Sequence, residues 1–372
     1  MRVTGLRYDE RMDDQRKELE ALRRKIDETD DRILAALAER AALAKKVGAI
    51  KDDTPRGYSP KRQREVIERV EAKGAGDFPR RAIPGVFREI VSACFALEGP
   101  LRVAYEGPPG SIGHEAARKK FGTSAEYLAC EGPRAALELV ERDHADSAVI
   151  VLESSTEGLL QPALDALADS SLKHVGEIEV DARVHLLSRA GNLQDIEKIY
   201  AAPDERAACA RFLATNLPRA QVIDTRSAAM AAQLAAEDPV AAALGGDVVG
   251  EMFSLQVARG NVSDVVGEHV RAAVTSTRPS QRTGHDTTSF VITLDDSPGS
   301  LFHALKPLAD RDLNLRRIQS RPRARVEEGG RAYRFFMEIA GHATDRPLVM
   351  AFEEMKRGVR QLKILGSYPS KS

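Results

Sequence analysis

The amino-acid sequence predicts a multidomain protein in which an all-helical region precedes an α/β region and a smaller α+β region. Residues 19–51 contain no proline and a single glycine, Gly48, which is typical of one long helix. From residue 101 short apolar strands alternate with amphipathic helices, which indicates an α/β domain with a largely parallel sheet. From residue 287 the pattern is β-α-β-β-α-β, which is typical of a ferredoxin-like fold.

The length and composition exclude several classes of protein. A chain of 372 residues suits two or three domains, and its net charge of −1 gives no general attraction to nucleic acid or membrane. No apolar run approaches the roughly 20 residues of a membrane span, and residues 1–15 are expected to form a frayed, charged leader. Three scattered cysteines favour a reducing cytoplasm, and no metal or cofactor is expected.

The predicted long helix carries cations where a packed face would need aliphatic residues. Its near-heptad positions are Leu22, Ile26, Thr29, Ile33, Leu37, Arg40, Ala44, Val47 and Lys51. Arg40 and Lys51 lie about three turns apart, and an unpaired buried cation costs several kcal/mol, so we expect both to meet an anion. Arg23 is about 42 Å from Lys51 along the axis and would serve such a pocket only in a partner chain. The alternative is an ordinary amphipathic helix whose cations snorkel to the surface.

Two further helices are predicted to place polar groups on their apolar sides. In residues 60–73, Arg62 and Gln63 precede Val66 and Ile67 by four positions. A third helix spans about residues 81–98 with the stripe Ile83, Val86, Phe87, Ile90, Val91, Cys94, Leu97, which Glu98 continues. Four donors and one carboxyl group therefore predict a pocket for a small dianion.

The segments ALRRKID, ILAALAER, KKVGAIK, YSPKRQREV and FREIVSACFALE resemble the all-helical (AroQ-class) chorismate mutases over residues 16–99. The resemblance implies an interlocked helical dimer in which Arg40 and Arg62 hold the carboxylates of chorismate and Arg23 enters from the other subunit. Lys51 would donate to the ether oxygen of the breaking bond. Gln63, where many relatives have Glu, would contact the substrate hydroxyl.

The same resemblance places Glu98, where some members have Gln, beside the ether oxygen. A carboxylate cannot donate a hydrogen bond, so Glu98 would act there in its protonated form; the sequence leaves its protonation state open. The rearrangement of chorismate to prephenate is pericyclic and needs no nucleophile, base or metal. Fixed donors stabilise its separating charge, each by about 2.7–4 kcal/mol.

The α/β region resembles prephenate dehydratase over residues 100–280, a two-lobed fold like the periplasmic binding proteins. The resemblance rests on VAYEGPPGSIGHEAA, LESSTEG, KHVGEIEV and RSAAM. The Thr-Arg-Phe motif of that family, whose threonine is the favoured proton donor, is replaced here by Val270, Arg271 and Ala272. Other departures are Ser154, Pro109, Gly113, Ala201 and Ala202. We therefore expect a degenerate site, with Thr225 or Ser155 as proton donor in the alternative.

Residues 277–286 read as a linker, and residues 287–372 resemble an ACT regulatory domain. The loop SPGSL supplies Pro298, Gly299, Ser300 and Leu301, and Gly299 would let backbone amides approach a carboxylate at a helix start. The resemblance implies phenylalanine as ligand, with the site closed by a neighbouring chain through Asn314, Gln319, Ser320 and Arg321. The alternative is a purely structural dimerisation module.

Three hypotheses follow from the sequence. The first is a cytoplasmic chorismate mutase of phenylalanine biosynthesis with a degenerate dehydratase-like domain and an ACT domain. The second is a complete chorismate mutase and prephenate dehydratase that is regulated by phenylalanine. The third is a regulator without either activity. A homodimer, which could pair further into a tetramer, is expected in each case.

Overall fold

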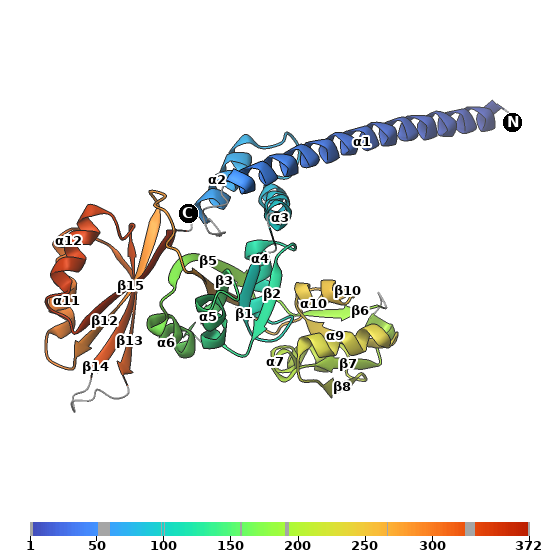
Figure 1. The fold of residues 1–372 in the computed structure, drawn as a ribbon. Coiled ribbons are helices and arrows are strands. Elements are labelled where there is room, and N and C mark those ends of the chain that lie inside the picture. The colour runs from blue at the N-terminus through green and yellow to red at the C-terminus, as the bar shows by residue number, and fades with distance from the viewer. Residues whose placement is uncertain are drawn as a thin grey trace.

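The computed structural model describes residues 3–50, 60–97, 99, 101–156, 158–189, 193–265, 267–323 and 332–370. Figure 1 shows a long helix, α1, that projects away from the remainder of the chain. The helices of this first region are α1 (Val3–Ile50), α2 (Pro60–Lys73), the short 3-10 helix η1 (Arg80–Ala82) and α3 (Ile83–Ala96). The helices that the sequence predicts at 60–73 and from about 81 are thus confirmed.

Helix α1 begins at Val3, well before the predicted start at Leu19. It therefore runs through most of the residues that we expected to form a separate leader. Residues 3–18 contain no proline and are rich in charged residues that favour helices, which explains the continuous helix. At 48 residues α1 is about 72 Å long, far longer than the helices around it.

The second region has two lobes, each built on one sheet. The first lobe has the sheet order β2-β1-β3-β11-β5, with β4 paired to β3. Its elements are β1 (Arg102–Glu106), α4 (Ile112–Phe121), β2 (Glu126–Cys130), α5 (Pro133–Glu141), β3 (Ser147–Ser154), β4 (Gly158–Leu159), α6 (Gln161–Asp169), β5 (Lys173–Asp181) and β11 (His269–Ser276). Strand β11 is antiparallel to β3 and β5, because the chain leaves through β5 and returns through β11.

The second lobe lies between β5 and β11 in the chain and has the sheet order β10-β6-β9-β7-β8. Its elements are β6 (His185–Ser188), η2 (Leu193–Asp195), β7 (Lys198–Ala201), α7 (Pro203–Ala208), α8 (Ala210–Asn216), β8 (Gln221–Asp224), α9 (Ala228–Glu237), β9 (Ala241–Gly245), α10 (Asp247–Met252) and β10 (Gln256–Arg259). The predicted two-lobed α/β architecture is present, but the prediction of a largely parallel sheet is wrong. Both sheets are mixed, because β11 runs antiparallel to β3 and β5, and β6 runs antiparallel to β9 and β10.

The C-terminal region has the predicted β-α-β-β-α-β order. Its elements are β12 (Asp286–Asp295), α11 (Ser300–Ala309), β13 (Leu315–Arg323), β14 (Ala332–Ala340), α12 (Arg346–Met355) and β15 (Gln361–Pro369). The antiparallel sheet has the order β13-β14-β12-β15, and α11 and α12 cover one face through a core that includes Phe290, Leu308 and Phe352. This is the ferredoxin-like arrangement that the sequence predicts.

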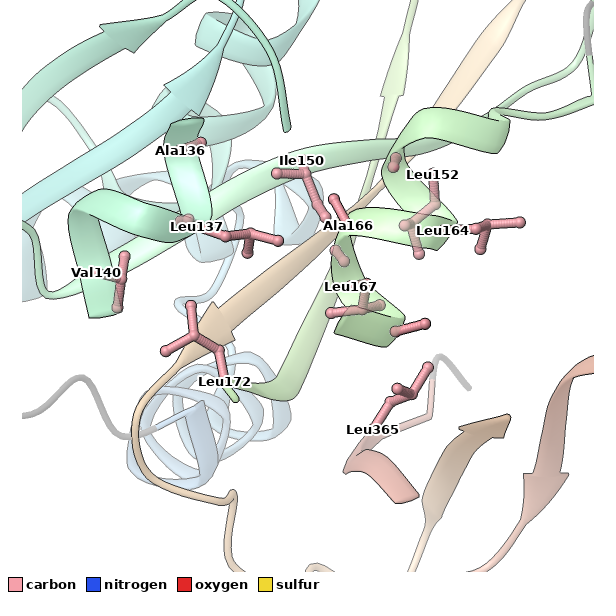
Figure 2. Packing of buried hydrophobic residues seen from close by; sticks show 14 of the residues in the cluster. Ala136, Leu137, Val140, Ile150, Leu152, Leu164, Ala166, Leu167, Leu172 and Leu365 are labelled. Carbon is pink, nitrogen blue, oxygen red and sulfur yellow. The ribbon is translucent and has the colours of Figure 1, made fainter. Parts of the chain in front are cut away.

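The other side of this sheet packs on the first lobe. Ile150 and Leu152 of β3 share a core with Leu167 of α6, and Leu365 of β15 belongs to the same cluster (Figure 2). A Cβ atom at Gly366 would lie 2.2 Å from the carbonyl oxygen of His174 in β5, so only glycine permits this approach. The C-terminal region and the first lobe are therefore joined by a continuous apolar interface. Among the described helices, none is long and apolar enough to span a lipid bilayer.

Candidate functional site

The proposed mutase cations lie on helices that are largely open to solvent. Arg40 is half-buried, and its Nη1 donates to the carbonyl oxygen of Ile90 in α3 at 3.4 Å. The Arg62 side chain is 69% exposed and pairs with Glu65 at 3.3 Å. Arg23 is exposed on the free part of α1. Lys51 and Glu98 lie outside the described residues.

Among the α1 side chains that the structure describes, from residue 15 onward, those near the C-terminal end pack on the rest of the chain. The half-buried residues of this helix are Leu37, Arg40, Ala41, Ala44 and Gly48, and their spacing of three and four places them on one face against α3. The rest of the apolar seam is exposed, with Leu22, Ile26, Ile33 and Leu34 each more than half accessible. A single chain therefore leaves both this apolar face and the surroundings of Arg23 uncovered.

Gln63, the residue expected to contact the substrate hydroxyl, lies against the first lobe in this structure. It is 9% exposed, and its amide donates to the carbonyl oxygen of Lys120 in α4 at 3.2 Å. Adjacent residues of a helix point about 100° apart, so the exposed Arg62 faces away from this contact. In this chain Gln63 is an interface residue between the helical region and the first lobe, which the sequence pattern of α2 alone did not indicate.

Val270 lies beside a small polar network. It pairs with Ser154 across β11 and β3. The Ser154 Oγ lies 2.8 Å from the Thr156 Oγ1, and that hydroxyl donates to the Glu268 Oε1 at 2.9 Å. Thr156 and Glu268 were not expected as site residues; each lies two positions from Ser154 or Val270, the spacing that could have indicated them. A hydroxyl and a carboxyl group thus adjoin the position where valine replaces threonine.

The other candidate proton donors lie apart from each other. Ser155 is exposed, and its Oγ accepts from the backbone N–H of His269 at 3.0 Å. Thr225 belongs to the second lobe, and its hydroxyl donates to the carbonyl oxygen of Ser227 at 3.1 Å. Ala201 and Ala202 are buried and bring no polar group to this lobe.

The two lobes touch through α4 and α10. The Glu115 carboxylate of α4 accepts from the backbone N–H groups of Asp247 and Val248, at the start of α10. Burial, with the nearby charge of Asp247, raises the pKa of Glu115 to about 8. Arg118 and Glu251 form an ion pair at 2.9 Å beside it. Burial also lowers the pKa of His114, on the same helix, to about 4.

Arg271, the residue that the chain shares with the Thr-Arg-Phe motif, is the centre of a buried ion cluster. It is 9% exposed and contacts Glu153 at 2.9 Å, Glu338 at 2.6 Å and also Glu177. Burial disfavours its charge, but the charges of Glu177 and Glu338 outweigh burial and raise the pKa of Arg271. Arg317 completes the cluster by contacting Glu153 and Glu338.

This ion cluster joins two regions of the chain. Glu338 and Arg317 belong to β14 and β13 of the C-terminal region, whereas Glu153 and Glu177 belong to the first lobe. His174 is fully buried next to the cluster, and burial lowers its pKa to about 3. Arg271 was expected in a substrate site. In the structure its guanidinium group forms ion pairs with carboxylates of the same chain.

The residues expected to bind the effector do not all lie on the same surface of the ferredoxin-like domain. Gly299 has a φ of +81° and directly precedes α11. A loop that presents its backbone amides to a ligand at a helix start needs this left-handed conformation, which glycine adopts without strain. Gln319 and Ser320 are exposed on β13, at the edge of the sheet, and Asn314 is exposed just before that strand. Arg321 instead contacts α6, donating to the Gln161 carbonyl oxygen at 2.9 Å and to Asp165 at 2.6 Å. Within the described part of the chain, no cluster of three or more His, Cys, Asp or Glu side chains could hold a metal ion.

The fold is that of a multidomain protein with a helical region, a two-lobed α/β domain and a ferredoxin-like domain. Comparison with protein families agrees: residues 22–99 match chorismate mutase type II, and residues 103–279 match prephenate dehydratase. A bifunctional chorismate mutase/prephenate dehydratase of Aquifex aeolicus is 36% identical, over 95% of this chain and 98% of that protein. The chain belongs to the family of bifunctional chorismate mutase/prephenate dehydratases.

Solved structures resemble nearly three quarters of the chain. Prephenate dehydratase of Arthrobacter aurescens, in complex with L-Phe, is 30% identical with a TM-score of 0.61, covering 72% of this chain and 90% of that one. GqqA, described as a quorum quenching acylase, is 26% identical with a TM-score of 0.62, covering 73% and 98%. Because proteins named for different activities share this fold, the fold alone does not fix the chemistry of the second domain.

Proposed function

We propose that the helical region catalyses the rearrangement of chorismate to prephenate, in a site assembled by two copies of the chain. The observation that carries this proposal is the uncovered part of the α1 seam, with exposed Leu22, Ile26 and Ile33; Arg23 is exposed on the same part of the helix, and Arg40 follows where the seam reaches α3. Apolar residues so exposed along one helix face favour a partner, and the same face of a second copy is complementary to it.

The chemistry suits these residues. Arg40 and Arg62 bind the two carboxylates and so select the compact conformer of the substrate. Arg23 of the second copy adds a third cation, and Lys51 donates to the ether oxygen as negative charge develops there. No proton needs to leave the protein, and no covalent intermediate forms.

One assay tests this proposal directly. Purified protein is mixed with chorismate, and prephenate and phenylpyruvate are followed separately, while sedimentation gives the oligomeric state. Prephenate formation by a dimer is the expected result. A chain that binds aromatic amino acids but leaves chorismate unchanged would instead support the third hypothesis, a regulator without enzymatic activity.

A second candidate function is prephenate dehydratase. The similarity to bifunctional relatives along nearly the whole chain favours this alternative over the degenerate site that the residue substitutions suggest. The hydrogen-bonded set Thr156, Ser154 and Glu268 also favours it, since Glu268 or Thr156 could donate a proton beside Val270.

The substitutions themselves argue for a lost or weak activity. Val270 has the shape of threonine without its proton, and Ala201 and Ala202 offer no hydrogen bond. The degenerate-site hypothesis therefore predicts that phenylpyruvate forms from prephenate no faster than in a blank without enzyme. The comparison is made near neutral pH because acid converts prephenate spontaneously. Val270→Thr alone should not restore activity, since the surrounding motif has also changed.

Turnover clearly above the blank would establish the bifunctional alternative. In that case Glu268→Gln and Thr156→Val should each lower the rate by about 10²-fold or more, as expected for loss of general acid catalysis. Ser263→Ala, in the second lobe, is the control. Loss of activity in Thr225→Val instead would assign the proton donor to the second lobe.

The ferredoxin-like domain is proposed to bind phenylalanine as an ACT effector domain. The support is Gly299 at the start of α11, exposed Asn314 just before β13, exposed Gln319 on β13, and the relative whose structure contains L-Phe. Calorimetry should detect saturable binding of phenylalanine that Gly299→Val abolishes, because the left-handed backbone there strains any β-branched residue. If phenylalanine, tyrosine and tryptophan all fail to bind, the domain serves only for assembly.

A further inference from the structure

Helix α2, which carries Arg62, is held by the two regions that follow it. On one side Gln63 donates to the carbonyl oxygen of Lys120 in α4 at 3.2 Å. On another side the Arg64 Nη1 donates to the carbonyl oxygen of Ser370, just after β15, at 3.0 Å. The Arg64 side chain is only 25% exposed. The start of α2 is therefore fixed by contacts outside the helical region.

Ser370 is itself held within the ferredoxin-like domain. Its backbone N–H donates to the carbonyl oxygen of His285 at 2.8 Å. Its Oγ lies 2.7 Å from the Thr287 Oγ1 of β12, and it accepts from the Arg316 Nη1 at 2.9 Å. Arg316 also donates to the Thr287 Oγ1 at 2.8 Å. The carbonyl group that Arg64 contacts is thus part of a cross-linked corner of the sheet.

These hydrogen bonds connect the proposed effector strand to the proposed mutase helix. Arg316 lies on β13, two residues after Asn314 and three before Gln319, the exposed residues proposed to close the effector site. At the other end, Arg64 is two residues from Arg62 in the first turns of α2. The path Arg316, Ser370, Arg64 is a continuous series of hydrogen bonds.

We propose that Arg64 is a positioning residue that couples the orientation of Arg62 to the ligand state of the ferredoxin-like domain. This inference rests on the proposed mutase function. A ligand that shifts β13 shifts Ser370 with it, and Arg64 transmits the shift to the start of α2. A displacement of about 1 Å at a substrate-binding group can change a rate by about 10²-fold, so a small movement is enough. Coupling of this kind is reciprocal between the two ligands.

The test uses the full chain with Arg64→Ala and the conservative Arg64→Lys. Arg69→Ala, which removes an exposed arginine of the same helix, is the matched control. The kcat and KM for chorismate are measured with and without saturating phenylalanine. Hydrogen exchange of residues 60–73 is recorded under the same two conditions, and this readout does not depend on catalysis.

In the unaltered chain, phenylalanine should change both the KM for chorismate and the exchange of α2. Arg64→Ala should bind phenylalanine with unchanged affinity but lose both responses, and its basal KM should rise several-fold with a smaller change in kcat. Arg64→Lys should keep part of the response, and Arg69→Ala should keep all of it. A merely structural contact would not separate effector binding from its effect on α2.

Two results would overturn the inference. One is an Arg64→Ala protein in which phenylalanine still alters α2 as it does in the unaltered chain. The other is an unaltered chain in which α2 does not respond to phenylalanine at all. If chorismate is not rearranged, the proposed mutase function fails, whereas the exchange measurement still decides whether Arg64 connects the two regions.

Discussion

Two sets of arginines that sequence comparison would treat alike differ sharply in their surroundings. In the helical region Arg40 is half-buried, and Arg62 is mostly exposed and pairs with Glu65 on its own helix. In the first lobe Arg271 is buried and meets carboxylates from three different strands. A buried arginine whose charge is balanced within the chain stabilises structure, whereas an arginine that keeps most of its surface in solvent remains accessible to an anionic ligand.

The same difference applies to the domains as wholes. The helical region exposes an apolar seam that one chain cannot cover, while the first lobe shares a closed core with the ferredoxin-like domain. A family motif residue that is present in the exposed helical region is best explained by contact with a ligand or with a second copy of the chain. A family motif residue that is present in the buried interior of the first lobe can be explained by its contacts within the chain alone. Each prediction below tests one side of this contrast.

The largest effect is expected for Arg271→Met. Removing the guanidinium leaves Glu153, Glu177 and Glu338 close together, with Arg317 as the remaining cation. Breaking a buried ion cluster in this way costs about 3–5 kcal/mol in the free energy of unfolding. Urea unfolding followed by circular dichroism measures the loss. Arg183→Met, which removes an exposed ion pair with Asp181, should cost about 0–1 kcal/mol. Equal costs for both variants would contradict a buried structural role for Arg271.

The next largest effect is expected on catalysis, when cations of the helical region are removed. Arg40→Ala or Lys51→Ala should lower the kcat for chorismate by about 10²-fold or more, because each removes a donor to the charged transition state. The free energy of unfolding should change by only about 0.5 kcal/mol. Lys46→Ala, an exposed cation of α1, is the control for activity. A loss of activity that tracks a loss of stability would mean that these cations are structural.

A partial recovery is expected when two inactive chains share a dimer. Arg23→Ala and Lys51→Ala chains, mixed and allowed to exchange, should regain about a quarter of the unaltered activity, since half of the dimers carry one intact site of two. The recovered rate is measured after subunit exchange has been verified by mass spectrometry. No recovery after verified exchange would refute a site shared between subunits.

The smallest effect is a change in how stability depends on pH. The pKa of Glu115 is raised from its ordinary value of 4.5 to about 8, so the folded state holds this proton more tightly than the unfolded state. Its contribution to stability is complete below pH 4.5 and declines as the pH rises towards 8. Glu115→Gln should remove this decline, so its Tm should fall less than that of the unaltered chain between pH 5 and 8.5.

The exposed Glu237→Gln serves as the control for this measurement and should leave the pH profile unchanged. If Glu115→Gln also follows the profile of the unaltered chain, the Glu115 carboxyl is hydrated in solution. The two lobes would then be open at α4 and α10, and the contrast between an open helical region and a closed second region would weaken.

Local structure was largely determined by the sequence. The helix at 60–73, the strands and helices of the first lobe and the β-α-β-β-α-β order follow from hydrophobic periodicity and from the positions of glycine and proline. Gly299 at the start of α11 was also predictable, because a left-handed residue before a helix requires glycine. Such features depend on neighbours within a few residues, which the sequence displays directly.

Only the tertiary structure decided which side chains meet. Gln63 contacts α4, Arg321 contacts α6, and Arg271 gathers Glu153, Glu177 and Glu338 from strands far apart in the chain. The pairing of β3 with β11 is what brings Thr156 and Glu268 within hydrogen-bond distance of each other. The physical reason is that a charged or polar side chain is satisfied by whichever group the fold brings within about 3 Å. Sequence periodicity specifies which face a residue occupies but not what lies opposite that face.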